Sequence, residues 1–228
     1  GIACALAVSD DGPLAADVAR DGFEVHTLRM MRSRLDVSAP WRLARLVHKL
    51  APRIVHWHGT RAAFFGAASS VFWARRVPTI YSVHGLSYRR IASPVQERLF
   101  LAAERLACAR ATAVICVAAA DATDLRERGF VAAGSVYHVP NGIDLDRFAP
   151  RPQAPARVRL GLPVTAQVVG TVARLVREKA VQVSIEAMSP VPTATLVVIG
   201  DGPERQRLEA EAARRSVSVR FLGERSDV

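Results

Sequence analysis

The sequence predicts an α/β protein built from doubly wound parallel sheets. Short apolar and β-branched runs alternate with stretches of helical periodicity along most of the 228 residues, which is typical of repeated strand–helix units. The runs are almost continuously apolar, as in parallel strands that are covered on both faces. Half of the residues are hydrophobic and 23% are charged, a composition that provides a core and excludes a disordered or collagen-like chain.

Nine strands are predicted from these runs. In order along the chain they span Ile2–Val8, Glu24–Leu28, Ile54–His56, Thr79–Ser82, Ala113–Val117, Val136–Val139, Val168–Val172, Thr195–Ile199 and Val219–Leu222. Five prolines fall within residues 140–163 and interrupt the pattern, as in an interdomain linker. We therefore expect a first domain over residues 1–145, a linker over 146–163, and the start of a second domain, with an incomplete sheet, over 164–228.

Helices are predicted from apolar stripes and end signals between the strands. Apolar residues at i, i+3, i+4 and i+7 within 43–50 form one stripe, and Pro52 ends that helix. A capping box at Ser93 begins the next helix. Its predicted buried stripe consists of Leu99, Ala102, Ala103 and Leu106. Pro203 is expected to open a later helix.

The formal net charge of +10 raises the question of a polyanionic partner. The excess is spread along the chain without a basic tract, which argues against nucleic-acid binding. Association with a polyanion or an anionic membrane through this charge stays open as an alternative. The longest small and apolar run, Ala111–Ala120, is about half as long as a membrane-spanning helix, and no secretory leader is visible.

The cysteines indicate a reducing compartment. Cys4, Cys108 and Cys116 lie among apolar residues and lack the CxxC spacing of a zinc site. This pattern suits buried thiols in the cytosol better than a disulfide framework. We expect a cytoplasmic protein.

Two cations follow the first strand of the predicted second domain. Arg174 and Lys179 come after the strand 168–172 and before a helix that begins near Val181. This places them at the carboxyl end of a strand and beside a helix N-terminus, where parallel sheets bind ligands and helices attract phosphate. The pair could hold a diphosphate or could be ordinary solvated cations. Lys49 and Lys179 are the only lysines, which favours a specific role for Lys179.

The next two strands end in glycine-containing turns. The strand 195–199 runs into Gly200-Asp201-Gly202, where the backbone could admit a ligand or could only make a tight connection to a helix. Leu222 and Gly223 end the last strand, in a position where the base of a ligand could rest. Because parallel strands end at one edge of a sheet, these turns are expected near the two cations.

A histidine follows a strand of the first domain. His84 comes after the strand 79–82, where an imidazole could donate a hydrogen bond to a sugar hydroxyl or to a developing charge. His56, His58 and His84 together could suggest a metal site. No carboxylate-rich set accompanies them, so local packing is the favoured explanation and we expect no metal site.

With these residues in view, the chain resembles the retaining glycosyltransferases of the GT-B type, group 1, also called family 4. No single motif carries the resemblance, which lies in the order and spacing of several. They are residues 54–59, 78–85, 139–144, 170–175 with Lys179, 198–204 and 221–223.

The resemblance implies two Rossmann-like domains, a nucleotide-sugar donor held by the second and a saccharide or lipid-linked acceptor held by the first. In this comparison Arg174 and Lys179 resemble the pair that neutralises the departing diphosphate. The turn Gly200–Gly202 resembles the one beneath the nucleotide, and Leu222–Gly223 resembles the wall beside its base. His84 resembles the histidine near the transferred sugar. Such enzymes require no metal ion or other cofactor.

The chain also departs from the family pattern. Two glutamates spaced by seven residues are expected beyond Val228, Ala180 replaces a usual glycine, and Ala118–Ala119 replaces a usual serine. We therefore expect an internal part of a longer enzyme that is inactive by itself.

Other interpretations stay open. The first is a truncated, noncatalytic nucleotide-binding remnant of such an enzyme. A sugar-nucleotide epimerase of the same shape would need an acid and a base that the sequence does not offer. The resemblance permits peripheral contact with the inner membrane face, for example through Arg29–Arg34.

Overall fold

A computed structural model describes residues 3–28, 36–90, 93–132, 134–225 and 227. The chain divides into two compact units, Gly1–Gly142 and Ile143–Val228, and each is described by itself. The stretch Arg29–Arg34 lies wholly outside the described residues. In the part of the chain that the structure describes, no helix has the length and apolar character needed to cross a membrane.

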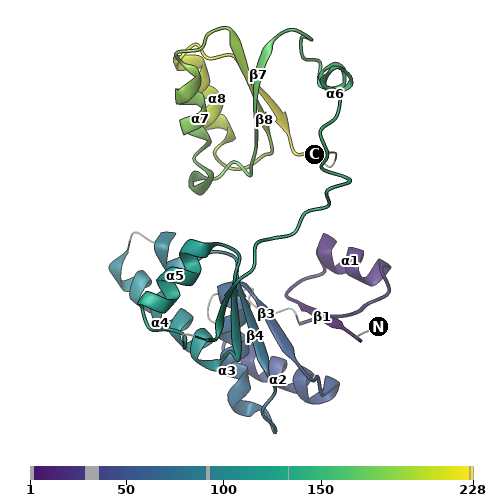
Figure 1. Ribbon diagram of the computed structural model, residues 1–228, viewed down its shortest axis with the longest axis vertical. Coiled ribbons are helices and arrows are strands. Elements are labelled where there is room, and N and C mark those ends of the chain that lie inside the picture. The colour runs from purple at the N-terminus through teal and green to yellow at the C-terminus, as the bar shows by residue number, and fades with distance from the viewer. Residues whose placement is uncertain (1–2, 29–35, 91–92, 133, 226, 228) are drawn as a thin grey trace. The chain divides into compact units, whose positions relative to one another are not determined.

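The first unit alternates strands and helices. Its elements are β1 (Ala5–Val8), α1 (Pro13–Arg20), β2 (Glu24–Thr27), α2 (Ala39–Leu50), β3 (Val55–His58), α3 (Gly59–Ser69), η1 (Ser70–Phe72), β4 (Thr79–Val83), η2 (Ser87–Arg90), α4 (Pro94–Arg110), β5 (Ala113–Cys116), α5 (Ala119–Glu127) and β6 (Val136–His138). Strands β3, β4, β5 and β6 form one parallel sheet, and β1 pairs with β2 in a second, two-stranded one (Figure 1). The predicted α/β class with parallel sheets is confirmed.

The core of the first unit lies around the four-stranded sheet. Trp57 of β3 and Tyr81 of β4 are buried in it, and the ring of Trp73 lies 6.5 Å from that of Trp57, measured between centroids. Helix α3 packs so closely on β3 that a Cβ at Gly66 would lie 2.4 Å from Nε1 of Trp57. A glycine is therefore required where this helix crosses the indole.

The second unit has the same construction on a smaller scale. Its elements are α6 (Gln153–Arg159), β7 (Gln167–Val172), η3 (Arg177–Lys179), α7 (Val181–Met188), β8 (Ala194–Ile199), α8 (Arg205–Arg214) and β9 (Val219–Gly223). The three strands form a parallel sheet in the order β7-β8-β9, and α7 and α8 lie together on one of its faces (Figure 1). Leu175, Ile185, Leu196 and Leu208 are fully or almost fully buried between sheet and helices.

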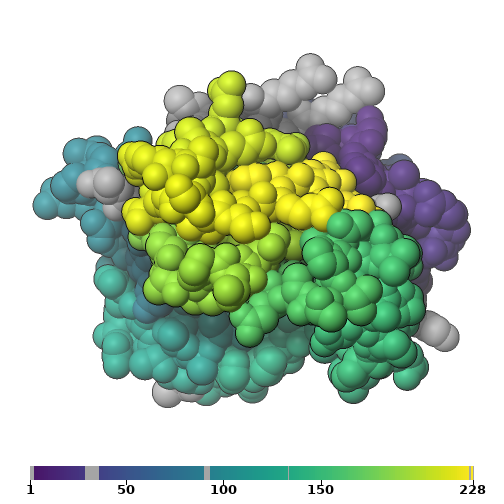
Figure 2. Space-filling model, turned by 90° about the horizontal axis from the view of Figure 1, so that it is seen from above, coloured from purple at the N-terminus to yellow at the C-terminus, as the bar shows by residue number. Residues whose placement is uncertain are grey.

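Helix α6 belongs to this second unit. The segment around it, green in Figure 2, lies against the yellow C-terminal strand. Arg220 of β9 donates a hydrogen bond to the carbonyl of Gly161, which follows the helix. Residues 153–159 of the predicted linker are helical. Pro155 lies in the first turn of this helix, where proline is tolerated.

Several local predictions are wrong. The buried face of α4 contains Glu104, Ala107 and Cys108, whereas Leu99 of the predicted stripe is 65% exposed. The polar residue Glu104 masks the true pattern, because the predicted stripe consists of apolar residues alone. The side chain of Ser93 makes no capping hydrogen bond. Helix α8 begins at Arg205 instead of Pro203.

Of the three cysteines, Cys108 and Cys116 are buried as expected and Cys4 is exposed. Burial raises the pKa of the Cys116 thiol to about 11 and raises that of Cys108 further. Both buried thiols therefore stay protonated and unreactive at neutral pH.

Candidate functional site

The carboxyl ends of the strands of the second unit are joined by backbone hydrogen bonds. The amide of Ala173, just after β7, donates to the carbonyl of Ile199 at 3.0 Å, and that of Leu175 donates to Asp201 at 2.9 Å. The amide of Glu204 donates back to the carbonyl of Leu175 at 3.0 Å. Arg174 therefore lies between Ala173 and Leu175, whose amides are hydrogen-bonded to the end of β8 and to the turn that follows it.

Two glycines make this close approach of the chains feasible. Gly200 and Gly202 have φ angles of +127° and +156°, which L side chains rarely adopt. A Cβ would lie 2.0 Å from the carbonyl oxygen of Ala173 at the first position, and 2.5 Å from that of Leu175 at the second. The amide of Gly200 also donates to the carbonyl of Gly223 at 2.7 Å, which joins the end of β9 to the same edge.

Arg174 and Lys179 are exposed at this edge. Among the described residues, neither side chain has a salt bridge within 4.0 Å. Lys179 ends the short helix η3, and Ala180, with a left-handed φ of +49°, leads directly into α7. Two unneutralised cations beside the first amides of a helix make a positive surface that suits phosphate groups.

The acidic residue of the same turn, Asp201, forms its hydrogen bonds within the protein. Asp201 accepts a hydrogen bond from the amide of Gly202 at 2.7 Å and one from Arg205 at 3.0 Å. These two bonds, the backbone one first, hold the pKa of Asp201 below its usual range. Arg205 also pairs with Glu209 at 2.9 Å. These contacts stabilise the turn and occupy Asp201, which forms no salt bridge with Arg174 or Lys179.

The predicted residues of the second unit thus meet at one edge. Backbone hydrogen bonds connect the segments that carry Arg174, Gly200, Gly202 and Gly223. Leu222, the residue before Gly223, is half-buried at the end of β9. The remaining predicted residue, His84, belongs to the first unit.

His84 is one of three linked histidines in the first unit. His56 and His58 of β3 lie beside β4, with His58 opposite Ser82 in register. Nε2 of His56 is 2.8 Å from the hydroxyl of Ser82, and Nδ1 of His58 is 3.2 Å from Nε2 of His84. The rings of His56 and His58 have centroids 4.1 Å apart. The described residues contain no group of three or more His, Cys, Asp or Glu side chains arranged to hold a metal ion.

Two of these histidines, His56 and His58, favour the neutral form. Burial, followed by the neighbouring imidazoles, lowers the pKa of both His56 and His58. His58 is also the residue that precedes α3, whose positive end disfavours a cation. Neutral rings can each donate one hydrogen bond and accept another.

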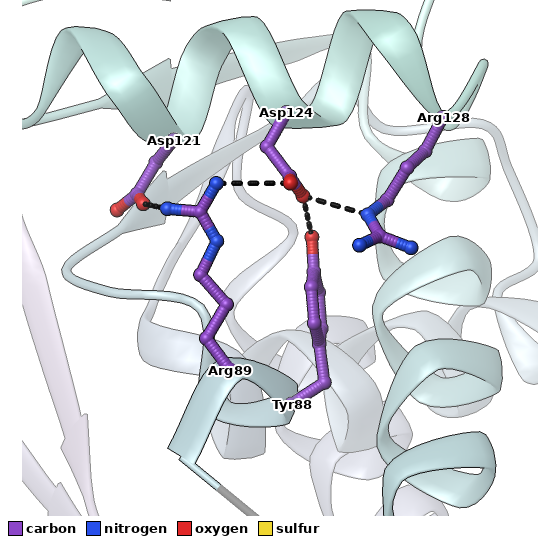
Figure 3. A network of polar contacts seen from close by, with 5 residues as sticks. All are labelled: Tyr88, Arg89, Asp121, Asp124 and Arg128. Atoms are coloured by element: carbon purple, nitrogen blue, oxygen red, sulfur yellow. Dashed lines mark hydrogen bonds and ion pairs between the residues drawn. The ribbon is translucent and has the colours of Figure 1, made fainter.

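The loop that carries His84 is fixed from outside by helix α5 (Figure 3). Tyr88 donates a short hydrogen bond to Asp124, which also accepts from Arg89 at 2.9 Å and from Arg128 at 2.8 Å. Arg89 reaches Asp121 at 3.2 Å as well. Burial alone would raise the pKa of Asp124, but the hydrogen bonds from Tyr88, Arg89 and Arg128 hold it below its ordinary value.

The same loop is fixed from inside by a buried carboxyl group. Ser87 lies 3.2 Å from the hydroxyl of Thr60, and the hydroxyl of Tyr81 donates to Oε1 of Glu104 at 2.6 Å. Tyr81 is also 3.4 Å from Thr60. Burial raises the pKa of the fully buried Glu104, which favours its protonated form.

Sequence reasoning missed these two groups of contacts. The sequence pattern assigns no role to Arg89, Asp124 or Glu104. One pattern could have pointed to the outer group, because Asp121, Asp124 and Arg128 recur at helical spacing on one face of α5. Nothing in the sequence marks Glu104 as the partner of Tyr81.

Comparisons with known proteins place the chain in a family. The model of "Glycosyltransferase Family 4" matches residues 2–147, and that of "Glycosyl transferases group 1" matches residues 153–228. The 2-deoxystreptamine glucosyltransferase of Streptomyces kanamyceticus is 32% identical over 135 residues, which are 56% of this chain and 35% of the relative. A GDP-mannose-dependent alpha-(1-6)-phosphatidylinositol monomannoside mannosyltransferase of Mycolicibacterium smegmatis is 36% identical over 95 residues, 39% of this chain and 25% of the relative.

The solved structures agree on the fold. The crystal structure of Anabaena Alr3699/HepE in complex with UDP-glucose has a TM-score of 0.80 and 22% identity, and the match covers 98% of this chain and 62% of that one. The chain thus spans about a third or less of the curated relatives described above and less than two thirds of this structure. By its family matches and its fold, the chain belongs to the group 1, family 4 glycosyltransferases with two Rossmann-like domains of the GT-B type.

Proposed function

We propose that the protein containing this chain transfers a sugar from a nucleoside diphosphate sugar to a saccharide or lipid-linked acceptor, with retention of the anomeric configuration. The observation that carries the proposal is the edge of the second sheet, where Arg174 and Lys179 are exposed near the Gly200–Gly202 turn and form no salt bridge with another described residue. The names of the relatives support it, since one transfers glucose to 2-deoxystreptamine and another depends on GDP-mannose. Retention rests on the resemblance to retaining members of the family.

The two cations would act on the leaving group. As the bond between the sugar and the diphosphate breaks, negative charge grows on the phosphate oxygens. Fixed cations stabilise this state more than the ground state and so lower the barrier. Arg174 offers a planar fork for two phosphate oxygens, and Lys179 a compact charge. On this proposal the step needs no metal ion or other cofactor, because the side chains supply the neutralising charge.

The glycine turn would hold the nucleotide. Gly200 and Gly202 present backbone without side chains at the strand ends, so a ligand can approach the chain closely. The half-buried Leu222 and the adjacent Gly223 lie at the end of the next strand, and we assign them to the wall beside the base. We assign His84 to the transferred sugar, because it is exposed at the carboxyl end of β4.

We propose that the protein works in the cytoplasm, with peripheral contact to the inner membrane face where the acceptor is lipid-linked. The free thiols and the net charge of +10 support this. Sedimentation with anionic vesicles at low salt, lost at high salt, is the expected result. Failure to bind such vesicles at low salt would contradict the membrane contact.

Nucleotide binding by this chain is tested by thermal unfolding with UDP, GDP and ADP. At a concentration about a hundredfold above Kd, a ligand adds about 2.7 kcal/mol to the stability of the unit that binds it. We expect one of the three to raise Tm by several degrees. Arg174→Ala should weaken binding about tenfold or more, because it removes hydrogen bonds to a charged group.

Arg214→Ala is the matched control, since it removes an exposed arginine of the same unit from the last turn of α8, whereas the Gly200–Gly202 turn precedes the first turn of that helix. It should leave Kd nearly unchanged. No Tm shift with any nucleotide, or equal losses in both variants, would contradict the donor site.

Transfer and retention are tested on the full-length enzyme by proton NMR of the product. Nucleotide binding without transfer, or an inverted anomeric centre, would contradict these parts of the proposal.

A further inference from the structure

We propose that His58 is the positioning residue of His84. An N–H···N hydrogen bond from Nε2 of His84 to Nδ1 of His58 fixes the second imidazole and leaves Nδ1 of His84 to accept a hydrogen bond from a hydroxyl of the transferred sugar. The sugar as the partner rests on the proposed function, whereas the histidine pair rests on geometry alone.

The geometry is that of two rings joined edge to edge. Nδ1 of His58 and Nε2 of His84 are 3.2 Å apart, the ring centroids are 5.5 Å apart, and the ring planes differ by 17°. The centroid separation exceeds the nitrogen separation by about two ring radii, so both nitrogens lie close to the line between the centroids. Such an arrangement is nearly linear and suits a hydrogen bond.

The hydrogen bond determines where the hydrogens lie. It needs one hydrogen between the two facing nitrogens, so either His84 donates from Nε2 or His58 donates from Nδ1. If His84 donates, both rings carry their hydrogen on Nε2, which is the form that neutral imidazole prefers. If His58 donates, both rings take the less favoured form. The first arrangement is therefore the more stable, and in it Nδ1 of His84 is a bare acceptor.

Nδ1 is therefore the nitrogen of His84 that can bind a ligand. Among the described residues no hydrogen bond reaches Nδ1 of His84, and the side chain is exposed. The role differs from the donor role that the sequence suggested for this histidine. A sugar hydroxyl can satisfy it, because a hydroxyl both donates and accepts.

The surroundings of His58 favour its neutral form. His56 faces His58 from the same strand, and the N-terminus of α3 follows directly after His58. Both disfavour a positive charge on His58. Among the described residues, no carboxylate forms an ion pair with any of the three histidines. A neutral His58 can accept the shared hydrogen at Nδ1, on which the assignment depends.

The first test is spectroscopic and uses this chain labelled with 15N-histidine. Across an N–H···N bond the two nitrogens show a scalar 15N–15N coupling, which we expect between Nε2 of His84 and Nδ1 of His58. In His58→Ala the coupling disappears and the imidazole N–H of His84 exchanges with water too fast to be seen. In His58→Asn that N–H becomes visible again, because the asparagine carboxamide lies near the former Nδ1 and can accept.

Two controls sharpen this comparison. His58→Gln places its carboxamide farther out and should not restore the N–H. His138→Ala, at the carboxyl end of β6 in the same sheet, should leave the coupling intact. Absence of the coupling in the native chain, or hydrogen on Nδ1 of His84, would overturn the assignment.

The second test uses the full-length enzyme. His58→Ala should lower kcat about tenfold or more, as expected for a misplaced group, and change KM for the donor less. His58→Asn should recover most of the loss. Equal kcat values for the Ala and Asn variants would overturn the positioning role. If the coupling is present but no nucleotide binds, the proposed function fails while the histidine pair stands.

Discussion

Gly66 is the residue at which one methyl group would disturb the first core. Its Cβ would lie 2.4 Å from Nε1 and 2.5 Å from Cε2 of Trp57, a ring that is only 5% exposed. We expect Gly66→Ala to lower the free energy of unfolding by about 1–3 kcal/mol, although alanine favours helices more than glycine does. Urea unfolding followed by circular dichroism measures the change.

Gly142→Ala is the control for that substitution. A Cβ at Gly142 meets nothing within 4 Å and the residue has no left-handed φ. The change in stability should stay within about 0.5 kcal/mol. Equal losses for the two variants would mean that the contact with Trp57 is not the cause.

The histidine cluster makes stability depend on pH. Burial and the adjacent imidazoles lower the pKa of His56 and His58 in the folded chain, below the ordinary value of 6.5. Below that value the unfolded chain binds more protons than the folded one, so stability falls with decreasing pH until the folded pKa values are reached. We expect the urea midpoint to fall between about pH 7 and pH 5, and to fall less in His58→Asn.

The matched control for the pH experiment is His138→Ala, a histidine outside the cluster. Its midpoint should follow the same pH dependence as that of the native chain. A profile for His58→Asn that coincides with both would show that the cluster does not contribute.

At the scale of elements, Asp124 is the carboxylate through which α5 holds the loop after β4 (Figure 3). Asp124→Ala leaves the hydroxyl of Tyr88 and the guanidinium groups of Arg89 and Arg128 without this acceptor. Hydrogen bonds to charged groups are worth about 1.5–3 kcal/mol, and we expect a loss in that range. Chemical unfolding of the chain measures it.

Asp17→Ala provides the comparison. Asp17 pairs with Arg20 on the surface of α1, and both side chains are largely exposed. Surface ion pairs of this kind contribute about 0–1 kcal/mol, so the loss should be small. A loss for Asp124→Ala that is no larger would contradict the clamping role.

The elements also show what the sequence could and could not predict. The strands were predictable because each is a short apolar run, and every predicted strand overlaps an observed one. Helix α3 was predicted only as one of the helical stretches between strands, without bounds, because Gly66 and its many alanines give it no clear apolar stripe. The buried face of α4 was mispredicted since burial favours the neutral form of Glu104 and its carboxyl group accepts a hydrogen bond from Tyr81, a contact between distant residues that no local pattern contains.

For the whole molecule, the two units carry separate cores that share no residue. Leu196 is fully buried in the second, and Leu196→Ala should destabilise that unit by about 2–5 kcal/mol. In hydrogen-exchange mass spectrometry we expect faster exchange in peptides after Ile143 and unchanged exchange before it.

Leu125→Ala, in the first core, is the mirror variant and should give the opposite pattern. Faster exchange throughout the chain in either variant would show that the units do not open separately.

The arrangement of the candidate site, like the fold, was predictable only in part. Arg174 and the glycine turn follow strands, so the topology of a parallel sheet brings their segments together. The bond between His58 and His84 depends instead on the register of β3 against β4, which the order of residues does not fix.

The tryptophans of the core have one more consequence. The chain has three, Trp41, Trp57 and Trp73, and all precede the boundary at Gly142. The part of this chain with the proposed phosphate-binding cations therefore contributes no indole fluorescence. A change in intrinsic emission when UDP or GDP is added would come from the other unit, and the protein would carry its own optical reporter of communication between its halves.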